Sequence, residues 1–224
     1  MEAEFWHSRW EKMQIGFHEG AVNRMLATHL AALGLARGAR IFLPLCGKTR
    51  DIAWLLAQEY RVAGAELSEI AVRQLFEEMD VTPEVTQTGP LRRYAALGID
   101  VFVGDIFDLT TGLLGAVDAV YDRAALVALP EAMRGRYAAH LAAITAHAPQ
   151  LLITFEYDPS VMNGPPFSLS NADVETCHGG RYDITVLAEA EVPGGLKGFC
   201  PAQERALLLR PKALAGRETS LNTA

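Results

Sequence analysis

The chain alternates short apolar runs with segments of helical periodicity, and this pattern constrains its fold more than any other feature. Helical patterns separate the first run from the second, the second from the third, and the fourth from the fifth. Strands joined through helices imply crossover connections and a parallel sheet, and nearly continuous apolar strands indicate a sheet covered on both faces. The pattern therefore predicts an α/β fold with a doubly wound, mostly parallel sheet. The five candidate strands are residues 40–44, 61–65, 100–104, 117–121 and 150–156.

Individual side chains support the predicted helices. Ser68 is suited to cap the helix after the second strand, because its hydroxyl can accept a hydrogen bond from a free backbone N–H group. A later helix, over 131–146, follows Pro130, whose missing N–H costs nothing in a first turn. The helix capped by Ser68 is expected to bury one face. Its apolar residues follow the spacing i, i+3, i+4, i+7, at Val72, Leu75, Phe76 and Met79.

The two ends of the chain differ from this alternation. Residues 182–192 and 203–210 resemble strands with only a loop between them, which predicts an antiparallel hairpin added to the sheet. Residues 1–38 contain two helical patterns, roughly 3–12 and 20–33, and are expected to form an N-terminal helical cap. We expect one domain over 1–224, with a catalytic α/β core at 39–212 and a flexible tail at 213–224.

Composition excludes several classes of partner. The formal charge of −7 and the lack of a basic cluster argue against nucleic acid and anionic membranes, because phosphates would be repelled. No apolar run approaches the roughly 20 residues of a membrane span, and the charged N-terminus lacks the pattern of a signal peptide.

The three cysteines are unpatterned, so neither a disulfide framework nor a zinc site is indicated, and we expect no metal. A monomer in the reducing cytoplasm is expected.

The predicted strand ends carry the candidate site, since ligands of open α/β sheets lie beyond the carboxyl ends of the strands. Gly47 follows the first strand, and Glu66 follows the second, about 20 residues later, at the offset where an acidic side chain meets ribose hydroxyls in dinucleotide folds. A turn with one glycine offers no cradle for a diphosphate. A nucleoside with a ribose and without phosphate, such as S-adenosylmethionine, satisfies both observations. Each feature alone also has a plain structural explanation, as a turn glycine or a solvated loop charge.

Six longer motifs resemble a known family. They are FWHSRWEKMQIGFHEG, PLCGKTRDIAWL, GAELSEIAV, GDIFDL, YDRAALVAL and YDPSVMNGPPFSLS, and in this order they resemble the bacterial thiopurine S-methyltransferases from residue 4 to about 178 and more loosely to 210. The resemblance implies a Rossmann-like fold of the class I methyltransferases. It also implies S-adenosylmethionine as cofactor and methyl transfer to the sulfur of aromatic or heterocyclic thiols.

The resemblance also implies a set of cofactor-binding residues. Trp6 and Trp10 would help to close over the cofactor, and the backbone of Leu45 would meet it. Glu66 would bind the ribose, and Asp105 and Ile106 would frame the adenine. Arg123 would lie near both cofactor and acceptor, as the catalytic candidate. The implied cofactor set is Trp6, Trp10, Leu45, Gly47, Glu66, Asp105, Ile106 and Arg123.

For the acceptor, the resemblance implies that Phe17, Arg123 and the GPPF loop with Pro166 and Phe167 line the substrate side. An aromatic thiol would stack on a ring such as that of Phe17. The sequence departs from the family in one place. Relatives can carry a second arginine before the last strand, whereas this chain offers only Lys197 and Arg205 in EVPGGLKGFCPAQER, which leaves the acceptor preference in doubt.

Three other functions remain open from the sequence. A methyltransferase acting on selenium or tellurium compounds, or on another small acceptor, would use the same cofactor site. A nicotinamide-dependent oxidoreductase shares the strand–turn–helix start, but the missing glycines argue against it. A non-catalytic protein that binds S-adenosylmethionine would need the same binding residues. The six histidines are scattered, and only His18, beside Phe17, is a candidate for substrate handling.

Overall fold

The computed structural model describes residues 3–16 and 18–213. Within these residues the strands form a single nine-stranded sheet in the order β3-β4-β5-β2-β1-β6-β7-β9-β8. All seven strands expected from the sequence are present, with ends shifted by at most two residues. The strand bounds are β1 Arg40–Pro44, β2 Arg61–Glu66, β3 Glu84–Thr88, β4 Leu91–Ala96, β5 Ile99–Val103, β6 Ala119–Arg123, β7 Gln150–Glu156, β8 Tyr182–Glu191 and β9 Gln203–Pro211.

The five central strands are parallel, as the alternating pattern predicts. From β1 the chain winds outward through β2 to β5, and then returns to the other side of β1 for β6 and β7. The order reverses between β1 and β6, so the chain segments that follow these two strands diverge. A doubly wound sheet holds its ligand at this point, beyond the carboxyl ends of the strands.

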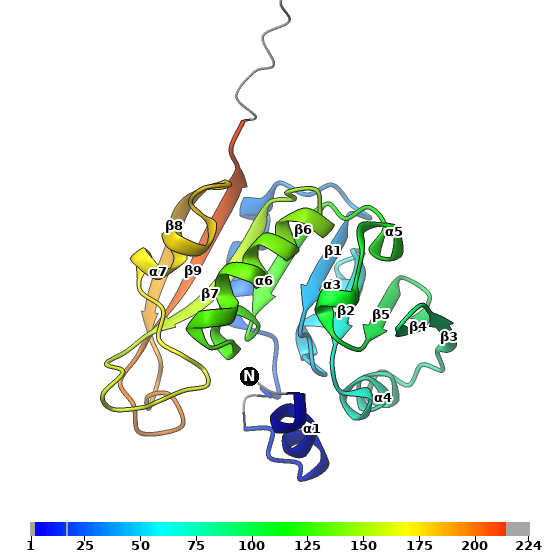
Figure 1. The fold of residues 1–224 in the computed structure, drawn as a ribbon, viewed down its shortest axis with the longest axis horizontal. Helices are drawn as coiled ribbons and strands as arrows, with labels where there is room; N and C mark the ends of the chain where they lie inside the picture. Colours follow the sequence, from blue (N-terminus) through cyan, green and yellow to red (C-terminus); the bar gives the residue numbers. More distant parts are fainter. Residues whose placement is uncertain (1–2, 17, 214–224) are drawn as a thin grey trace, which may run out of the picture.

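Helices cover both faces of the sheet, and each face has its own apolar core. In Figure 1, α6 lies in front of the sheet and α3 behind it. One face carries α2 Arg24–His29 with the 3₁₀ turn η1 Leu30–Leu33, α3 Arg50–Ala57 and α4 Glu69–Glu78. The other carries α5 Thr111–Leu114, α6 Glu131–Ile144 and α7 Asn171–His178. Ser68 caps α4 as predicted, with its side chain accepting from Ala71 N–H.

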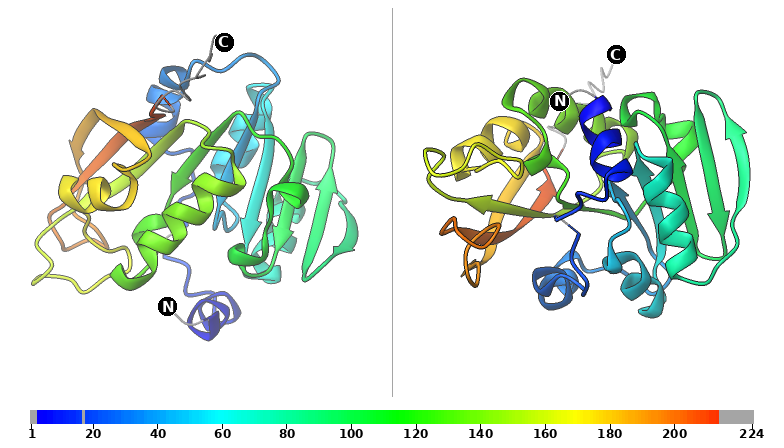
Figure 2. Two further views of the ribbon diagram at one scale, coloured as in Figure 1. Left: turned by 45° about the horizontal axis from the view of Figure 1, so that its top comes forward. Right: turned by 90° about the horizontal axis from the view of Figure 1, so that it is seen from below.

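The N-terminal segment divides into two parts with different positions. Helix α1, Ala3–Glu11, lies beyond one end of the strands and contacts α4, and in Figure 2 it stands in front of the strand ends when the molecule is seen from below. Helix α2 instead contacts β7 and β9, and its Met25 and Leu26 belong to the core. Of the two predicted helices, only the first covers the strand ends.

The C-terminal hairpin is confirmed. Strand β9 pairs antiparallel with β7, and β8 pairs antiparallel with β9 at the edge of the sheet. The sequence did not predict strands β3 and β4 or helices α5 and α7. Strands β3 and β4 form an antiparallel hairpin on the opposite edge, where β3 is exposed along nearly its whole length and so has no apolar run to mark it. Helix α7 begins at a capping box made by Ser170 and Asp173.

Candidate functional site

A pocket of about 910 Å³ opens at the carboxyl ends of β1, β2, β5 and β6, where the strand order reverses. Helix α1 covers one side of it, and the loops after β7 and β8 contribute to another. The volume lies within the range of about 300–1,000 Å³ that is usual for small-molecule sites. Among the predicted residues, those that line it are Trp6, Trp10, Leu45, Gly47, Glu66, Asp105, Ile106, Arg123 and Pro166.

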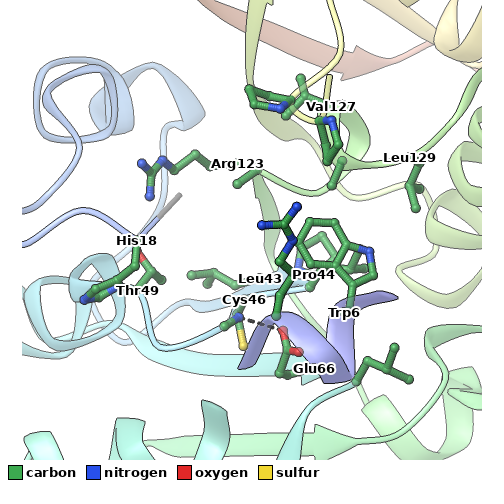
Figure 3. Close-up of a pocket in the computed structure, with 18 of the residues that line it drawn as sticks. Trp6, His18, Leu43, Pro44, Cys46, Thr49, Glu66, Arg123, Val127 and Leu129 are labelled. Carbon is green, nitrogen blue, oxygen red and sulfur yellow. Dashed lines mark hydrogen bonds between the residues drawn. The ribbon is translucent and has the colours of Figure 1, made fainter. Parts of the chain in front are cut away.

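Glu66 is the last residue of β2, and its side chain is fixed beside the turn that follows β1. One carboxylate oxygen accepts from the backbone N–H of Gly47, the dashed line in Figure 3, and the other accepts from that of Ser68, both at 2.8 Å. Burial raises the pKa of Glu66 above its ordinary value, although the N–H groups of Ser68 and Gly47 offset part of this effect. A carboxylate held in this way keeps lone pairs that can accept hydrogen bonds from a vicinal diol.

The turn after β1 takes a shape that brings backbone close to the pocket. Leu45 and Gly47 both have positive φ, of 48° and 52°. Trp10 of α1 is buried against Gly47, since a Cβ on this glycine would lie 3.2 Å from the indole. The absence of a side chain at Gly47 therefore lets α1 approach the turn closely.

Cys46, in the same turn, is a packing residue. Its sulfur faces Gly64 of β2, where a Cβ would come within 2.9 Å. Burial raises the pKa of its thiol well above the ordinary value, and the charge of Glu66 adds to this. A neutral buried thiol is a poor nucleophile, so the structure gives Cys46 no chemical part.

Asp105 and Ile106 lie after β5, at the start of a 3₁₀ turn, η2 Ile106–Asp108. One oxygen of Asp105 accepts from Phe107 N–H at 2.9 Å, so the residue caps this turn. The side chain is nevertheless exposed to the pocket. The carboxylate keeps lone pairs for further hydrogen bonds.

Arg123 ends β6 and is held between two carboxylates. Its Nη2 lies 2.5 Å from Glu19 Oε1, and its Nη1 lies 3.8 Å from Asp51 Oδ2. The guanidinium side chain is only 9% exposed, so this cation is buried at the wall of the pocket. In Figure 3, Arg123 and His18 lie well apart from Glu66.

Asp51 is itself fixed by a polar network behind the pocket. It is fully buried in the first turn of α3, where it accepts from the backbone N–H of Asn23 at 2.8 Å and from the hydroxyl of Tyr121 at 3.1 Å. Burial, followed by the charge of Asp51, raises the pKa of Tyr121 well above its ordinary value, so the hydroxyl stays protonated and donates. Asn23 also donates from its side chain to Glu204 at 2.9 Å.

Two predicted acceptor residues have different positions. Pro166 lines the pocket, and the hydroxyl of Tyr157 donates to its carbonyl at 2.6 Å, which fixes the loop. Phe167 does not line the pocket. It turns toward α6, where the guanidinium of Arg134 lies 5.3 Å from the ring centroid, because its backbone N–H is tied to Val127. Phe17 lies outside the described residues.

The C-terminal stretch contributes a lysine to the pocket. Lys197, in the loop between β8 and β9, lines it, whereas Arg205 is buried in the sheet. Arg205 pairs with Glu156 at 2.7 Å and donates to Asn171 at 2.8 Å, so it ties β9 to β7 and α7. Of the two basic residues in this stretch, Lys197 is therefore the one available to an acceptor.

His18 lines the pocket beside the turn after β1. Burial lowers its pKa below the ordinary value, and the nearby charge of Lys48 lowers it further, so its imidazole is neutral near pH 7. Sequence reasoning did not find Glu19, Asp51 or Tyr121. The pairing of Glu19 with Arg123 joins positions that are far apart in the chain, and no local pattern marks it.

Comparisons with known proteins identify the family of this chain. The sequence matches the thiopurine S-methyltransferase family over residues 1–198. A thiopurine S-methyltransferase of Xanthobacter autotrophicus is 58% identical over 210 residues, covering 93% of this chain and 99% of that protein. Proteins of the same name from Gluconobacter oxydans and Pseudomonas aeruginosa are 50% and 47% identical, over 93% and 87% of this chain and 95% and 89% of their own lengths.

Solved structures support the fold. A Burkholderia thailandensis 1,6-didemethyltoxoflavin-N1-methyltransferase with bound S-adenosylhomocysteine is similar with a TM-score of 0.65 at 17% identity, over 94% of this chain and 87% of that one. A magnesium protoporphyrin IX methyltransferase from Synechocystis gives 0.59 at 13% identity, over 93% and 100%. At such identities the likeness concerns the fold, which is that of the class I methyltransferases. No helix in residues 3–16 and 18–213 is long and apolar enough to cross a membrane.

The family match spans most of the chain, and the relatives are closely similar over nearly their whole lengths. The chain belongs to the thiopurine S-methyltransferase family.

Proposed function

We propose that this protein transfers the methyl group of S-adenosylmethionine to the sulfur of an aromatic or heterocyclic thiol such as a thiopurine. The observation that carries the proposal is one pocket with a buried carboxylate, Glu66, on one side and a buried guanidinium, Arg123, on another. The first suits a nucleoside and the second suits an acceptor. Family membership supports the same reaction.

The residues present fit S-adenosylmethionine. Glu66 can accept from the ribose hydroxyls while the Gly47 and Ser68 N–H groups keep its side chain in place. Asp105 and Ile106 would frame the adenine, and the turn at Leu45 would meet the methionine arm. Trp6 and Trp10 would cover the cofactor from α1, where an aromatic face also suits a positive sulfonium.

When bound, the cofactor supplies an electrophilic methyl group that an acceptor sulfur takes by in-line displacement. An aromatic thiol ionises readily, so the protein needs no strong base, and its contribution is positioning and exclusion of water. Arg123 can donate hydrogen bonds to a ring nitrogen of the acceptor and so orient it. Neutral His18 can accept a proton from an acceptor that is not yet ionised.

The acceptor side of the pocket suits a flat apolar ring. Val127, Leu129 and Pro166 give the pocket apolar surface, and Lys197 adds a flexible cation. We expect the protein to act as a monomer on a small-molecule acceptor. The cysteines, Cys46, Cys177 and Cys200, are buried and free, which suits a reducing cytoplasm.

An acceptor panel tests the proposal. Formation of S-adenosylhomocysteine is followed with 6-mercaptopurine, benzenethiol, selenite and tellurite under the same conditions, and each methylated product is identified by mass spectrometry. We expect S-methylated thiols, with a kcat/KM above that for either oxyanion. Turnover of selenite or tellurite without turnover of the thiols would instead favour the chalcogen reaction.

A further inference from the structure

The positive charge of Arg123 is already matched before an acceptor arrives. Glu19, on the segment after α1, pairs with Nη2 at 2.5 Å, while buried Asp51 lies 3.8 Å from Nη1. The two carboxylates differ in freedom, because the side chain of Asp51 is 0% exposed and that of Glu19 is 48% exposed. Asp51 is therefore a fixed partner, and Glu19 is the partner that faces the pocket and solvent.

The neighbouring groups on this side do not reverse the excess of negative charge that Glu19 and Asp51 place around Arg123. Lys48 lies 2.7 Å from Glu78 and is neutralised by it. Glu204, behind Asn23, is an acid whose pKa is raised by burial, and the charge of Glu19 raises it further. The nearby Tyr121 and His18 are neutral near pH 7 for the reasons given above. Two carboxylates thus face the guanidinium of Arg123, and Lys197, from the loop between β8 and β9, is a further cation on the acceptor side.

We propose that Glu19 is a specificity-determining residue that selects acceptors without an oxyanion group. This rests on the proposed function and assigns an acceptor preference to the same pocket. With Glu19 in place, Arg123 serves neutral ring nitrogens or carbonyl oxygens as a hydrogen-bond donor, because the guanidinium carries five N–H groups and Glu19 and Asp51 do not use them all.

An acceptor that carries a carboxylate, or a selenite or tellurite ion, meets a different situation. It must either displace Glu19 from Arg123 or bring a third negative charge beside the two already there. A like charge across an interface is repelled and disfavours the wrong partner. Removal of the Glu19 charge leaves Arg123 and Asp51 as a neutral pair, and the repulsion is relieved.

The test uses two acceptors of nearly the same shape, 4-mercaptobenzamide and 4-mercaptobenzoate. Their kcat/KM values are measured with the wild type, Glu19→Gln and Glu19→Asp, and their Kd values are measured by calorimetry with S-adenosylhomocysteine bound. Glu189→Gln on the exposed edge of β8 is the matched control, since it removes the same charge elsewhere on the surface.

We expect the wild type to prefer the benzamide and Glu19→Gln to shift the benzamide-to-benzoate ratio toward the benzoate by about tenfold or more, in KM and Kd rather than in kcat. Glu19→Asp keeps much of the wild-type preference, and Glu189→Gln keeps all of it. A merely structural contribution of Glu19 would weaken both acceptors equally. An unchanged ratio in Glu19→Gln, within about twofold, overturns the inference.

The two readouts separate this inference from the proposed function. A shifted binding ratio without methylation of either thiol contradicts the S-methyltransferase proposal and supports the Glu19 assignment. Methylation of both thiols with an unshifted ratio overturns the Glu19 assignment alone. Because Glu19 is half-exposed, the Gln variant is expected to fold, which a melting curve verifies.

Discussion

The indole of Trp10 lies against the Cα of Gly47, so that a Cβ on the glycine would stand 3.2 Å from Cζ2 of the ring. Gly47 has a φ of 52°, and Trp10 is 2% exposed. The contact joins α1 to the turn that lies beside Glu66. The position of α1 over the pocket therefore depends on the lack of a side chain at one residue.

The change Gly47→Ala tests this contact. A left-handed backbone costs a non-glycine residue about 1–2 kcal/mol, and the new methyl group also presses on Trp10. We expect a lower melting temperature and a Kd for S-adenosylmethionine raised about tenfold or more, measured by calorimetry. Gly34→Ala is the control, because Gly34 has a φ of 67° with no atom within 4 Å of the added Cβ.

Gly34→Ala is expected to lower stability by the backbone strain alone and to leave cofactor binding unchanged. If Gly47→Ala binds S-adenosylmethionine as tightly as the wild type, the contact between Trp10 and Gly47 does not position the cofactor side of the pocket.

Arg123→Lys separates charge from hydrogen-bond geometry. A lysine keeps the positive charge beside Asp51 but loses the planar fork of the guanidinium. We expect kcat with an aromatic thiol to fall about 10- to 100-fold at saturating S-adenosylmethionine. The melting temperature shows whether the variant is folded. Wild-type turnover would remove Arg123 from the reaction.

Asp122 gives a prediction for stability against pH. It is 1% exposed beside the pocket wall, and burial raises its pKa from 3.8 to about 6, although hydrogen bonds from Leu126 N–H, Tyr137 and Ala125 N–H oppose this. The folded state therefore holds a proton that the unfolded state releases between these values. The proton on Asp122 therefore stabilises the folded state. This stabilisation is fully present below pH 3.8 and is lost as the pH rises through about 6.

The stabilisation by protonated Asp122 amounts to about 3 kcal/mol. The figure follows from about 1.4 kcal/mol for each unit between the pKa values of the unfolded and folded states. Asp122→Asn cannot release a proton. Urea unfolding between pH 4 and 7 should therefore show the variant gaining stability relative to the wild type as the pH rises. A constant difference across this range would mean that Asp122 titrates normally in the folded protein.

His178 makes stability depend on pH in the opposite direction over the same pH range. It is 1% exposed in α7, neither ring nitrogen has a hydrogen-bond partner, and burial lowers its pKa from 6.5 to about 4. Because the unfolded state binds the proton more tightly, this contribution is present above pH 6.5 and is lost as the pH falls through about 4. Its size is also about 3 kcal/mol.

His178→Leu should abolish the loss of stability that His178 causes at low pH. The variant is therefore expected to gain stability relative to the wild type as the pH falls from 7 to 4. In the wild type the slopes of Asp122 and His178 largely cancel, and only the single variants reveal them. Parallel stability curves for His178→Leu and the wild type would contradict the prediction.

Much of the fold could be predicted because its central strands are buried on both faces. Strand β1, for example, is apolar from Ile41 to Pro44, and Ser68 marks the start of α4. Strand β3 could not be found in this way, since it lies at an exposed edge and has no buried face to impose a pattern. Helix α7 did carry a signal, in the capping box of Ser170 and Asp173.

Much of the cofactor side of the pocket could be predicted because Gly47, Glu66 and Asp105 lie at the carboxyl ends of strands. Trp6 and Trp10 lie in α1 instead, and only the family resemblance indicated them. The acceptor side could be predicted only in part. Arg123 and Pro166 line the pocket as expected, but other features depend on contacts between distant segments. Glu19 reaches Arg123 from the segment after α1, and Phe167 is drawn toward Arg134 rather than into the pocket. Sequence spacing carries no information about either pairing.

Transfer of a labelled methyl group from S-adenosylmethionine to 6-mercaptopurine tests the central claim most directly, with wild type and Glu66→Ala compared. Loss of a hydrogen-bonding carboxylate costs about 1.5–3 kcal/mol, so we predict S-methylated product with the wild type and a KM for the cofactor raised about 10- to 100-fold in the variant. Glu189→Gln should behave as the wild type. No labelled product from the wild type, or an unchanged cofactor KM in Glu66→Ala, would contradict the account.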